Sequence, residues 1–229
     1  MSQFDPRIPR ELAVRLGEEA VAISKAGKYV GQAGQVDISA HVLASLKKTT
    51  FYAADHAHAP ASKGAHSTRI EVTNETTLSA HQRHLAKGHD IVSLNFASAT
   101  QPGGGFLGGA RAQEEYLCRS SALFLSIKDS PMYDYHRDNW TPFYSDAMIY
   151  SPEVPVFRDD EHRMLEAPFK VAFISAAACD ARDVAPLDQP KIAGANFSQL
   201  WRDLNNCPNR SSALRWRPST RQPEVSLSN

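Results

Sequence analysis

A run of glycines between an expected strand and an expected helix restricts the fold of this chain more than any other feature. Residues 103–109 contain five glycines in seven positions. They follow Asp90–Ala97, an apolar stretch typical of a mostly buried strand, and precede a helix that should begin near Ala112 or Gln113. Glycine lets backbone N–H groups approach a ligand, and a helix N-terminus carries partial positive charge. This turn is therefore suited to a diphosphate.

Two common phosphate-binding loops do not fit this spacing. A Walker loop needs a lysine followed by serine or threonine, and residues 103–112 contain no lysine. A dinucleotide-binding fingerprint needs an acidic residue about twenty positions further on. Here Glu114 and Glu115 come too soon, on the first turn of the expected helix. Since two carboxylates would repel a phosphate, we expect the diphosphate on the glycines and a neutral sugar near the glutamates.

Adjacent glutamates beside such a turn indicate glycosidic chemistry at a ribose. Breaking a glycosidic bond requires a general acid, and burial next to a like charge would raise the pKa of one glutamate toward that role. Neighbours in sequence cannot straddle a scissile bond as an inverting or retaining pair does. One glutamate should therefore act while the other positions. The alternative is that both only complement the helix dipole.

Charge and composition limit other functions. Lys plus Arg and Asp plus Glu are 25 each, so no basic field exists to hold a nucleic acid nonspecifically. The three cysteines form no CxxC pair, which argues against a disulfide framework or a cysteine zinc site and favours an intracellular location. A solvated loop is favoured over a zinc site for His56, His58 and His66. No stretch approaches the roughly eighteen apolar residues of a membrane span.

Two amphipathic helices are expected in the N-terminal part. Arg10–Lys25 has apolar residues at helical spacing, and Gly27 stops it. Ser39–Lys48 should begin with a serine cap. The apolar side of this second helix consists of Val42, Leu43 and Leu46.

A strand, a helix and a second strand follow. Ser67–Val72 alternates β-branched and polar residues, and the helical segment Asn74–Lys87, ended by Gly88, leads to the strand 90–97. This order is typical of a βαβ unit, which predicts a mixed or parallel sheet covered by helices.

Later segments are less regular. Pro152 and Pro155 restrict residues 148–159 to an edge strand or an irregular arm, and Val171–Ala178 is a buried-strand candidate. From about residue 190 no helical or strand period is sustained, and we expect the last twenty or so residues to be poorly ordered. Arginines and tryptophans in this tail would suit a nucleic-acid arm, but we expect a solvated tail without direct nucleic-acid binding.

The segment PGGGFLGGARAQEE resembles the GGG-x7-QEE signature of poly(ADP-ribose) glycohydrolases. GKYVGQAGQVDIS, IEVTNETTLSA and MIYSPEVPVFRDD also resemble the microbial-type branch of that family, over about residues 4–180. The resemblance implies an α/β macrodomain, a three-layer α/β/α sandwich with a mixed sheet. The expected parts are an N-terminal helical extension (1–66), a macrodomain-like catalytic core (67–190) and an irregular polar tail (191–229).

The resemblance also implies roles for single residues. Glu115 would be the general acid and base that hydrolyses the ribose–ribose bond, and Glu114 would hydrogen-bond the ribose hydroxyls. Asn95 would orient a ribose hydroxyl or serve as a structural amide, and Gln113 would bind substrate or hold the loop. No metal and no cofactor are implied. The glycines expected to bind substrate are Gly103, Gly104, Gly105, Gly108 and Gly109.

By this resemblance the chain would release ADP-ribose from poly(ADP-ribose), reversing ADP-ribosylation in the DNA damage response. Its partners would be poly(ADP-ribose) or ADP-ribose and ADP-ribosylated proteins. The expected compartment is the cytoplasm, or the nucleus in a eukaryote.

One departure from the family concerns the C-terminal part. Microbial members carry a second glycine-rich loop of the form LGAWGCGVFxND, and the sequence after Asp180 contains none. We expect the last strand and this loop to be lost or replaced, which would remove part of the ligand cradle. A second hypothesis is therefore a module that binds ADP-ribose with little or no turnover.

Overall fold

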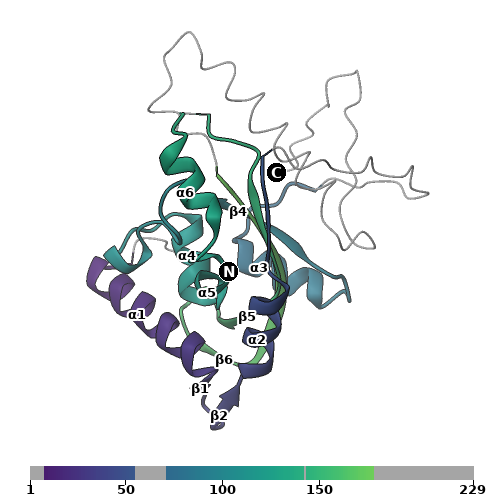
Figure 1. Ribbon diagram of the computed structural model, residues 1–229. Coiled ribbons are helices and arrows are strands. Elements are labelled where there is room, and N and C mark those ends of the chain that lie inside the picture. Colours follow the sequence, from purple (N-terminus) through teal and green to yellow (C-terminus); the bar gives the residue numbers. More distant parts are fainter. Residues whose placement is uncertain (1–7, 55–70, 142, 178–229) are drawn as a thin grey trace, which may run out of the picture.

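The structure is a computed structural model that describes residues 8–54, 71–141 and 143–177 (Figure 1). Its α-helices are α1 (Arg10–Ala26), α2 (Ser39–Lys48), α3 (Thr77–Leu85), α4 (Gln113–Ser120), α5 (Leu123–Ile127) and α6 (Pro131–Asp138). A short 3-10 turn, η1, spans Phe106–Gly108. The strands are β1 (Lys28–Val30), β2 (Gln35–Asp37), β3 (Thr50–Tyr52), β4 (Val92–Ala97), β5 (Met148–Arg158) and β6 (Met164–Ala177).

The main sheet is mixed and has the strand order β3-β5-β6-β4. β5 runs antiparallel to both β3 and β6, whereas β4 pairs in parallel with β6. The parallel register places Asn95 opposite Ser175. β1 and β2 form a separate antiparallel hairpin. β4 therefore ends beside β6, and the glycine turn begins at that end of the sheet.

The main core lies between one face of the sheet and the helices. It joins strand residues such as Ile149 and Phe173 to buried residues of every α-helix in the described ranges. A smaller cluster on the opposite face contains Met148, Tyr150 and Ile174 and no helical residue among those described. The predicted α/β class with a mixed sheet and N-terminal helices is confirmed. The described residues supply the sheet and the helical layer on one face.

The two N-terminal helices form where the sequence predicts them. Gly27 ends α1 in the left-handed region, with a φ of 66°. The cap of α2 differs from the prediction, because Ser39 is itself the first helical residue. The carboxylate of Asp37 caps the helix instead and accepts hydrogen bonds from the Ser39 N–H (2.7 Å) and Oγ (2.6 Å).

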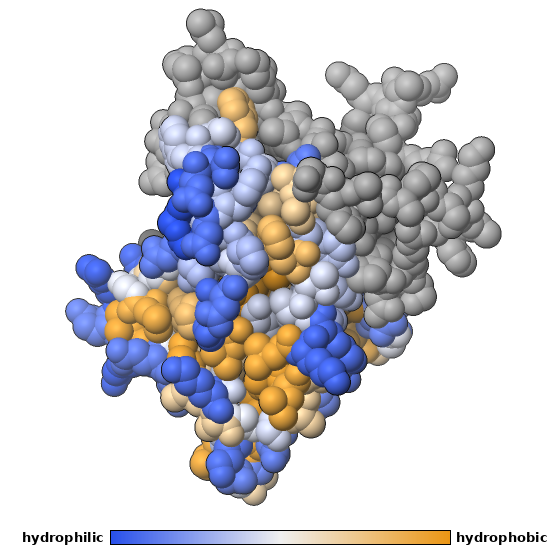
Figure 2. All heavy atoms as spheres, viewed as in Figure 1, coloured by the Kyte–Doolittle hydropathy of each residue, from blue (hydrophilic) through white to orange (hydrophobic). Residues whose placement is uncertain are grey.

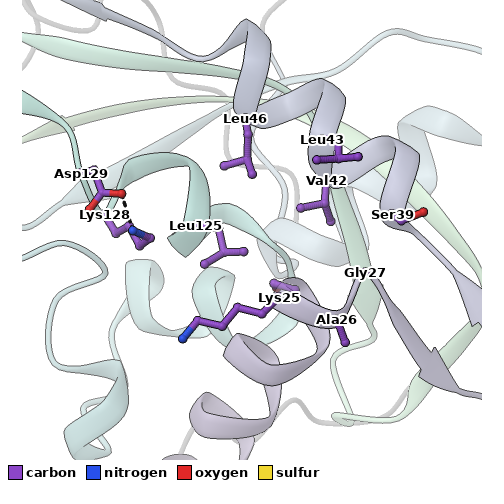
Figure 3. A pocket seen from close by; sticks show the side chains of 11 residues that line it. Lys25, Ala26, Gly27, Ser39, Val42, Leu43, Leu46, Leu125, Lys128 and Asp129 are labelled. Carbon is purple, nitrogen blue, oxygen red and sulfur yellow. Dashed lines mark hydrogen bonds and ion pairs between the residues drawn. The ribbon is translucent and has the colours of Figure 1, made fainter.

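The apolar side predicted for α2 is only partly buried. Val42 lies in the core, but Leu43 is 66% exposed and Leu46 is 40% exposed. Together with Leu125 of α5 and Lys25 of α1 they line a cavity of about 510 Å³ (Figure 3). Figure 2, which is viewed from the same side as Figure 1, shows apolar side chains gathered on the lower part of the molecular surface between charged ones.

The prediction that residues 148–159 form an edge strand or an irregular arm is wrong for the beginning of β5. The first three residues of β5 lie between β3 and β6. The prolines are tolerated because β3 pairs only with those residues, and the register against β6 shifts between Ser151 and Val154. Beyond the shift, the Pro155 carbonyl accepts a hydrogen bond from the Ala122 N–H (3.0 Å).

The predicted strand at Ser67–Val72 is not supported. Residues 71 and 72 lie outside any strand, and residues 67–70 fall outside the described ranges. The parallel partner of β4 is β6 rather than a strand before α3. α3 begins later than predicted because Thr76 acts as its cap and accepts a hydrogen bond from the Ser79 N–H (3.0 Å).

Several expectations fall outside the described residues. They concern the loop with three histidines, the tail after Ala177, the second glycine-rich loop and both domain boundaries. In the described ranges, no helix is long and apolar enough to cross a membrane. Nor do those ranges contain a group of three His, Cys, Asp or Glu side chains that could hold a metal ion.

Candidate active site

The site begins at the end of β4, where Asn95 is fully buried. Its Nδ2 donates to the Ser175 Oγ on β6 (3.0 Å) and lies 3.4 Å from the Glu114 Oε1 on α4. Asn95 therefore connects two strands and the helix, as expected of a structural amide. Its Oδ1 is buried with no hydrogen-bond partner in the described part of the chain.

The glycine turn depends on backbone conformations that favour glycine. Gly103, Gly104 and Gly109 have φ values of 70°, 56° and 82°. The turn lies over Phe106, which is 1% exposed and packs against Phe124 with ring centroids 4.8 Å apart. A Cβ on Gly103 would lie 3.0 Å from the Phe106 ring. The packed rings of Phe106 and Phe124 thus lie directly against Gly103 and support the glycine turn.

Glu115 is held by one backbone amide within the glycine turn and one just after it. The Gly105 N–H donates to Oε1 and the Ala112 N–H donates to Oε2, each at 2.9 Å. Glu115 is only 7% exposed. Its side chain reaches back over the first turn of α4, as a glutamate at the third helical position does. The carboxylate is therefore fixed against the turn.

Glu114 lies deeper, at 3% exposure. The Ser98 N–H donates to its Oε2 at 2.7 Å. Burial and, to a smaller degree, the neighbouring Glu115 charge together raise the pKa of Glu114 to about 7, against the lowering effect of the hydrogen bonds from Ser98 and Asn95. The raised pKa that the sequence predicts for one of the pair thus falls on Glu114, the residue to which the resemblance gives the positioning role.

The two carboxylates converge on Gly104. A Cβ at this position would collide with the Glu115 Oε1 and would lie 3.1 Å from the Glu114 Oε2. Glycine is therefore required here by space as well as by φ. Because both groups face the same point, they approach a ligand from one side and cannot straddle a bond, in agreement with the sequence argument.

Gln113 contacts β4, and the last two glycines of the turn contact α1. Gln113 accepts a hydrogen bond from the Phe96 N–H (2.8 Å) and donates to the Leu94 carbonyl (2.9 Å), so its carboxamide pairs with the edge of β4. These bonds hold the start of α4 against β4. The Gly108 carbonyl accepts from Arg10 Nε of α1 (2.9 Å), and a Cβ on Gly109 would approach Arg10.

The sequence missed other contributors to the site. Ser98 supplies its backbone N–H and Ser175 its hydroxyl, and neither belongs to a recognisable motif. Only the position of Ser98, directly after a buried strand, could have suggested it.

Comparisons with known proteins agree with this arrangement. The model of the microbial-type PARG catalytic domain matches residues 17–159. No curated protein matches the chain.

Solved structures of bacterial poly(ADP-ribose) glycohydrolases are similar to this one. The enzyme from Thermomonospora curvata is 39% identical, with a TM-score of 0.81 over 88% of this chain and 77% of the other. The same enzyme bound to the inhibitor ADP-HPD gives 39% identity and a TM-score of 0.79, over 88% and 76% of the two chains. The enzyme from Deinococcus radiodurans in complex with ADP-ribose gives 36% and 0.62, over 71% and 69%. This chain therefore belongs to the family of microbial-type poly(ADP-ribose) glycohydrolase catalytic domains.

Proposed function

We propose that this chain hydrolyses the ribose–ribose O-glycosidic bond of poly(ADP-ribose) and releases ADP-ribose. The observation that carries the proposal is the convergence of Glu114 and Glu115 on Gly104 inside a glycine turn. The similar bacterial enzymes, one bound to ADP-HPD and one to ADP-ribose, support this substrate class. Family membership and a complete carboxylate pair favour turnover over a module that only binds.

The glycine turn would bind the diphosphate. Gly103, Gly104 and Gly105 present backbone without Cβ atoms at the N-terminal side of α4, where the helix dipole favours negative charge. Local dipoles of this kind explain how a chain with zero formal net charge holds an anion. Gly108 and Gly109 would act at the outer side of the same turn.

Glu115 would act as general acid and then as general base. It gives its proton to the leaving 2′-oxygen while the bond from that oxygen to the anomeric carbon breaks and an oxocarbenium-like ribose forms. Its carboxylate then takes a proton from the water that attacks the anomeric carbon. One water is consumed, and the proton that Glu115 gave to the leaving oxygen is replaced by one from that water.

Glu114 and Asn95 would hold the ribose during these steps. With a pKa of about 7, Glu114 is partly protonated at neutral pH, which limits charge repulsion between the two glutamates. It would hydrogen-bond the ribose hydroxyls, and the unpartnered Asn95 Oδ1 would accept from one of them. The roles given to these groups require no metal.

Wider aspects of the proposal follow from the substrate. ADP-ribosylated proteins would be the carriers of the polymer, and the setting would be intracellular reversal of ADP-ribosylation, including the response to DNA damage. We also propose that residues 1–66 form a largely helical extension that packs on a core of residues 67–190 and adds the strand β3 to its sheet. The hydrogen bond from Arg10 to the Gly108 carbonyl and the close approach of Gly17 to Phe106 support this packing.

Turnover of labelled poly(ADP-ribose) by Glu115→Gln tests the catalytic assignment. We expect a loss of about 10²–10⁴-fold in kcat, while ADP-ribose still binds in calorimetry. Glu18→Gln, at an exposed position of α1, is the matched control and should leave turnover unchanged. Equal turnover by Glu115→Gln and the unchanged chain would contradict the assignment, and binding without turnover by the unchanged chain would leave only a binding module.

A further inference from the structure

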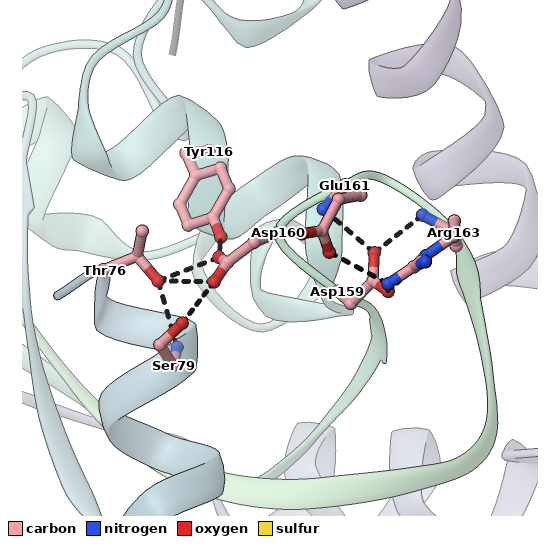
Figure 4. Close-up of polar contacts among 7 residues, drawn as sticks. All are labelled: Thr76, Ser79, Tyr116, Asp159, Asp160, Glu161 and Arg163. Carbon is pink, nitrogen blue, oxygen red and sulfur yellow. Dashed lines mark hydrogen bonds and ion pairs between the residues drawn. The ribbon is translucent and has the colours of Figure 1, made fainter. Parts of the chain in front are cut away.

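Tyr116 of α4 belongs to a polar network separate from the contacts of Glu114 and Glu115 with the glycine turn. Tyr116, the residue after Glu115, is 8% exposed, and its hydroxyl donates to the Asp160 Oδ1 in the loop between β5 and β6 (Figure 4). Burial raises the pKa of the Tyr116 phenol, and the Asp160 carboxylate raises it further. The phenol therefore stays protonated and remains a donor.

Asp160 is itself fixed by α3. The Thr76 Oγ1 donates to its Oδ2 at 2.7 Å, and the Ser79 Oγ donates to the same oxygen at 2.5 Å (Figure 4). Thr76 is the N-cap of α3, so the carboxylate lies at the positive end of that helix dipole. Hydroxyls from two helices thus hold one carboxylate, and that carboxylate connects α3 to α4.

This connection acts on the orientation of α4. Successive residues of an α-helix are turned by about 100° around its axis. Tyr116 therefore cannot leave Asp160 by a rotation of α4 without moving the carboxylates of Glu114 and Glu115 away from Gly104. Such a rotation would break or lengthen the hydrogen bonds that Glu115 accepts from the Gly105 and Ala112 N–H groups.

We propose that Tyr116 and Asp160 are positioning residues that fix the rotation of α4 and so hold both glutamates against the glycine turn. Tyr116 would act on the glutamates through the backbone of α4, and Asp160 would act through its hydrogen bond with Tyr116. The inference rests on the proposed function for its kinetic consequence, but its structural consequence can be measured without any activity.

Tyr116→Phe removes only the hydroxyl and is the kinetic test. We expect kcat to fall about tenfold, since misplacement by a fraction of an ångström already weakens catalysis. KM for the polymer and the Kd of ADP-ribose should stay within about twofold, because the glycine turn that binds the diphosphate is unchanged. Asp160→Asn should lower kcat similarly, and the double variant should be no worse than the lower single variant, because the two residues act as one unit.

Tyr29→Phe is the matched control. The Tyr29 hydroxyl donates to the Leu165 carbonyl at 2.5 Å, and Tyr29 is 6% exposed. The same chemical change therefore removes a hydrogen bond of a buried tyrosine that lies in the β1–β2 hairpin. We expect Tyr29→Phe to keep kcat. An equal loss of kcat in both variants would overturn the proposal, because it would indicate a general loss of stability.

Hydrogen exchange of the amides in residues 103–112 supplies the second readout. Positioning predicts faster exchange at Gly105 and Ala112 in Tyr116→Phe and Asp160→Asn, and unchanged exchange in Tyr29→Phe. If the unchanged chain has no turnover, the proposed function fails while this measurement still decides the inference. Unchanged exchange in all three variants would overturn the inference even in an active enzyme.

Discussion

Two regions of the molecule bury ionisable side chains in opposite ways. In the first, the cradle (Asn95 and residues 98–115), two adjacent carboxylates each receive backbone N–H groups. In the second, the α3 seat (α3 with Phe169 and Phe173 of β6), His81 is 3% exposed, and in the described part of the chain neither ring nitrogen has a hydrogen-bond partner. The cradle provides hydrogen-bond donors to its carboxylates, whereas the described residues of the seat provide no hydrogen-bond partner to the His81 ring.

The difference separates a site for chemistry from a site for packing. The cradle keeps two carboxyl groups together although burial opposes their ionisation, and such a cost is typical of a functional site. In the seat, the His81 ring packs edge-on against Phe169 and Phe173, with centroids 6.4 and 5.9 Å away. Burial lowers the pKa of His81 to about 4, against the opposing charge of Asp160, so the ring is neutral and behaves as an apolar group.

Gly104→Ala should have the largest effect, because it disturbs the cradle both by a steric collision and by backbone strain. The new Cβ would collide with the Glu115 Oε1, and alanine would have to adopt a φ of 56°. We expect kcat to fall at least about 10²-fold through displacement of the carboxylate. The free energy of unfolding should fall by about 2–3 kcal/mol from strain and overpacking. Polymer hydrolysis and urea unfolding measure the two effects, and unimpaired turnover would show that Glu115 need not stay beside this glycine.

Glu114→Gln tests the cost of charge in the cradle. Because the native pKa is about 7, native Glu114 holds a proton that the unfolded chain releases near pH 4.5. Stability should therefore fall as pH rises from about 4.5 to 7 and stay low above, by roughly 3 kcal/mol for this group. Glu114→Gln removes the charge and should gain most of that amount over the unchanged chain at pH 8 and little at pH 4.5. Urea unfolding at both pH values decides, and parallel pH profiles would contradict the cause given for the shift.

His81→Leu tests the seat, where the sign is reversed. The native imidazole stays neutral down to about pH 4, whereas the unfolded one binds a proton near pH 6.5. Stability should therefore be complete above pH 6.5 and fall as pH is lowered toward 4, by about 2 kcal/mol at pH 5. His81→Leu should abolish this acid loss while leaving the loss at the alkaline side to Glu114. If Glu114→Gln and His81→Leu changed the free energy of unfolding in the same pH range, the contrast between the two regions would be wrong.

Local signals in the sequence were sufficient for the parts that depend on neighbours in the chain. Gly27 marks the end of α1, and the start of α4 at Gln113 follows from the glycine turn. The sequence also predicts that one of two buried glutamates has a raised pKa. It could not say which, because the answer depends on whether the Ser98 N–H and Asn95 lie beside Glu114.

Contacts between distant segments were beyond the sequence argument. Tyr116 and Asp160 are 44 positions apart, and only the return of the chain after β5 brings them together. The interior place of β5 was missed for the same reason, since proline content describes a strand but not its neighbours. The individual roles of Glu114 and Glu115 came from a resemblance and not from spacing.

Gly88→Ala should have the smallest effect and completes the comparison. Gly88 follows α3 with a φ of 74°, its N–H donates to the Leu85 carbonyl (2.8 Å), and a Cβ there would meet nothing within 4 Å. Alanine should therefore cost only the left-handed backbone, about 1 kcal/mol, with kcat unchanged. Gly104→Ala carries the same backbone cost, so the difference between the two variants isolates the collision with Glu115. Thermal unfolding and polymer turnover of the two variants measure this difference, and Gly104→Ala should lose more of both. If Gly88→Ala lost as much turnover as Gly104→Ala, backbone strain alone would explain the requirement for glycine at position 104.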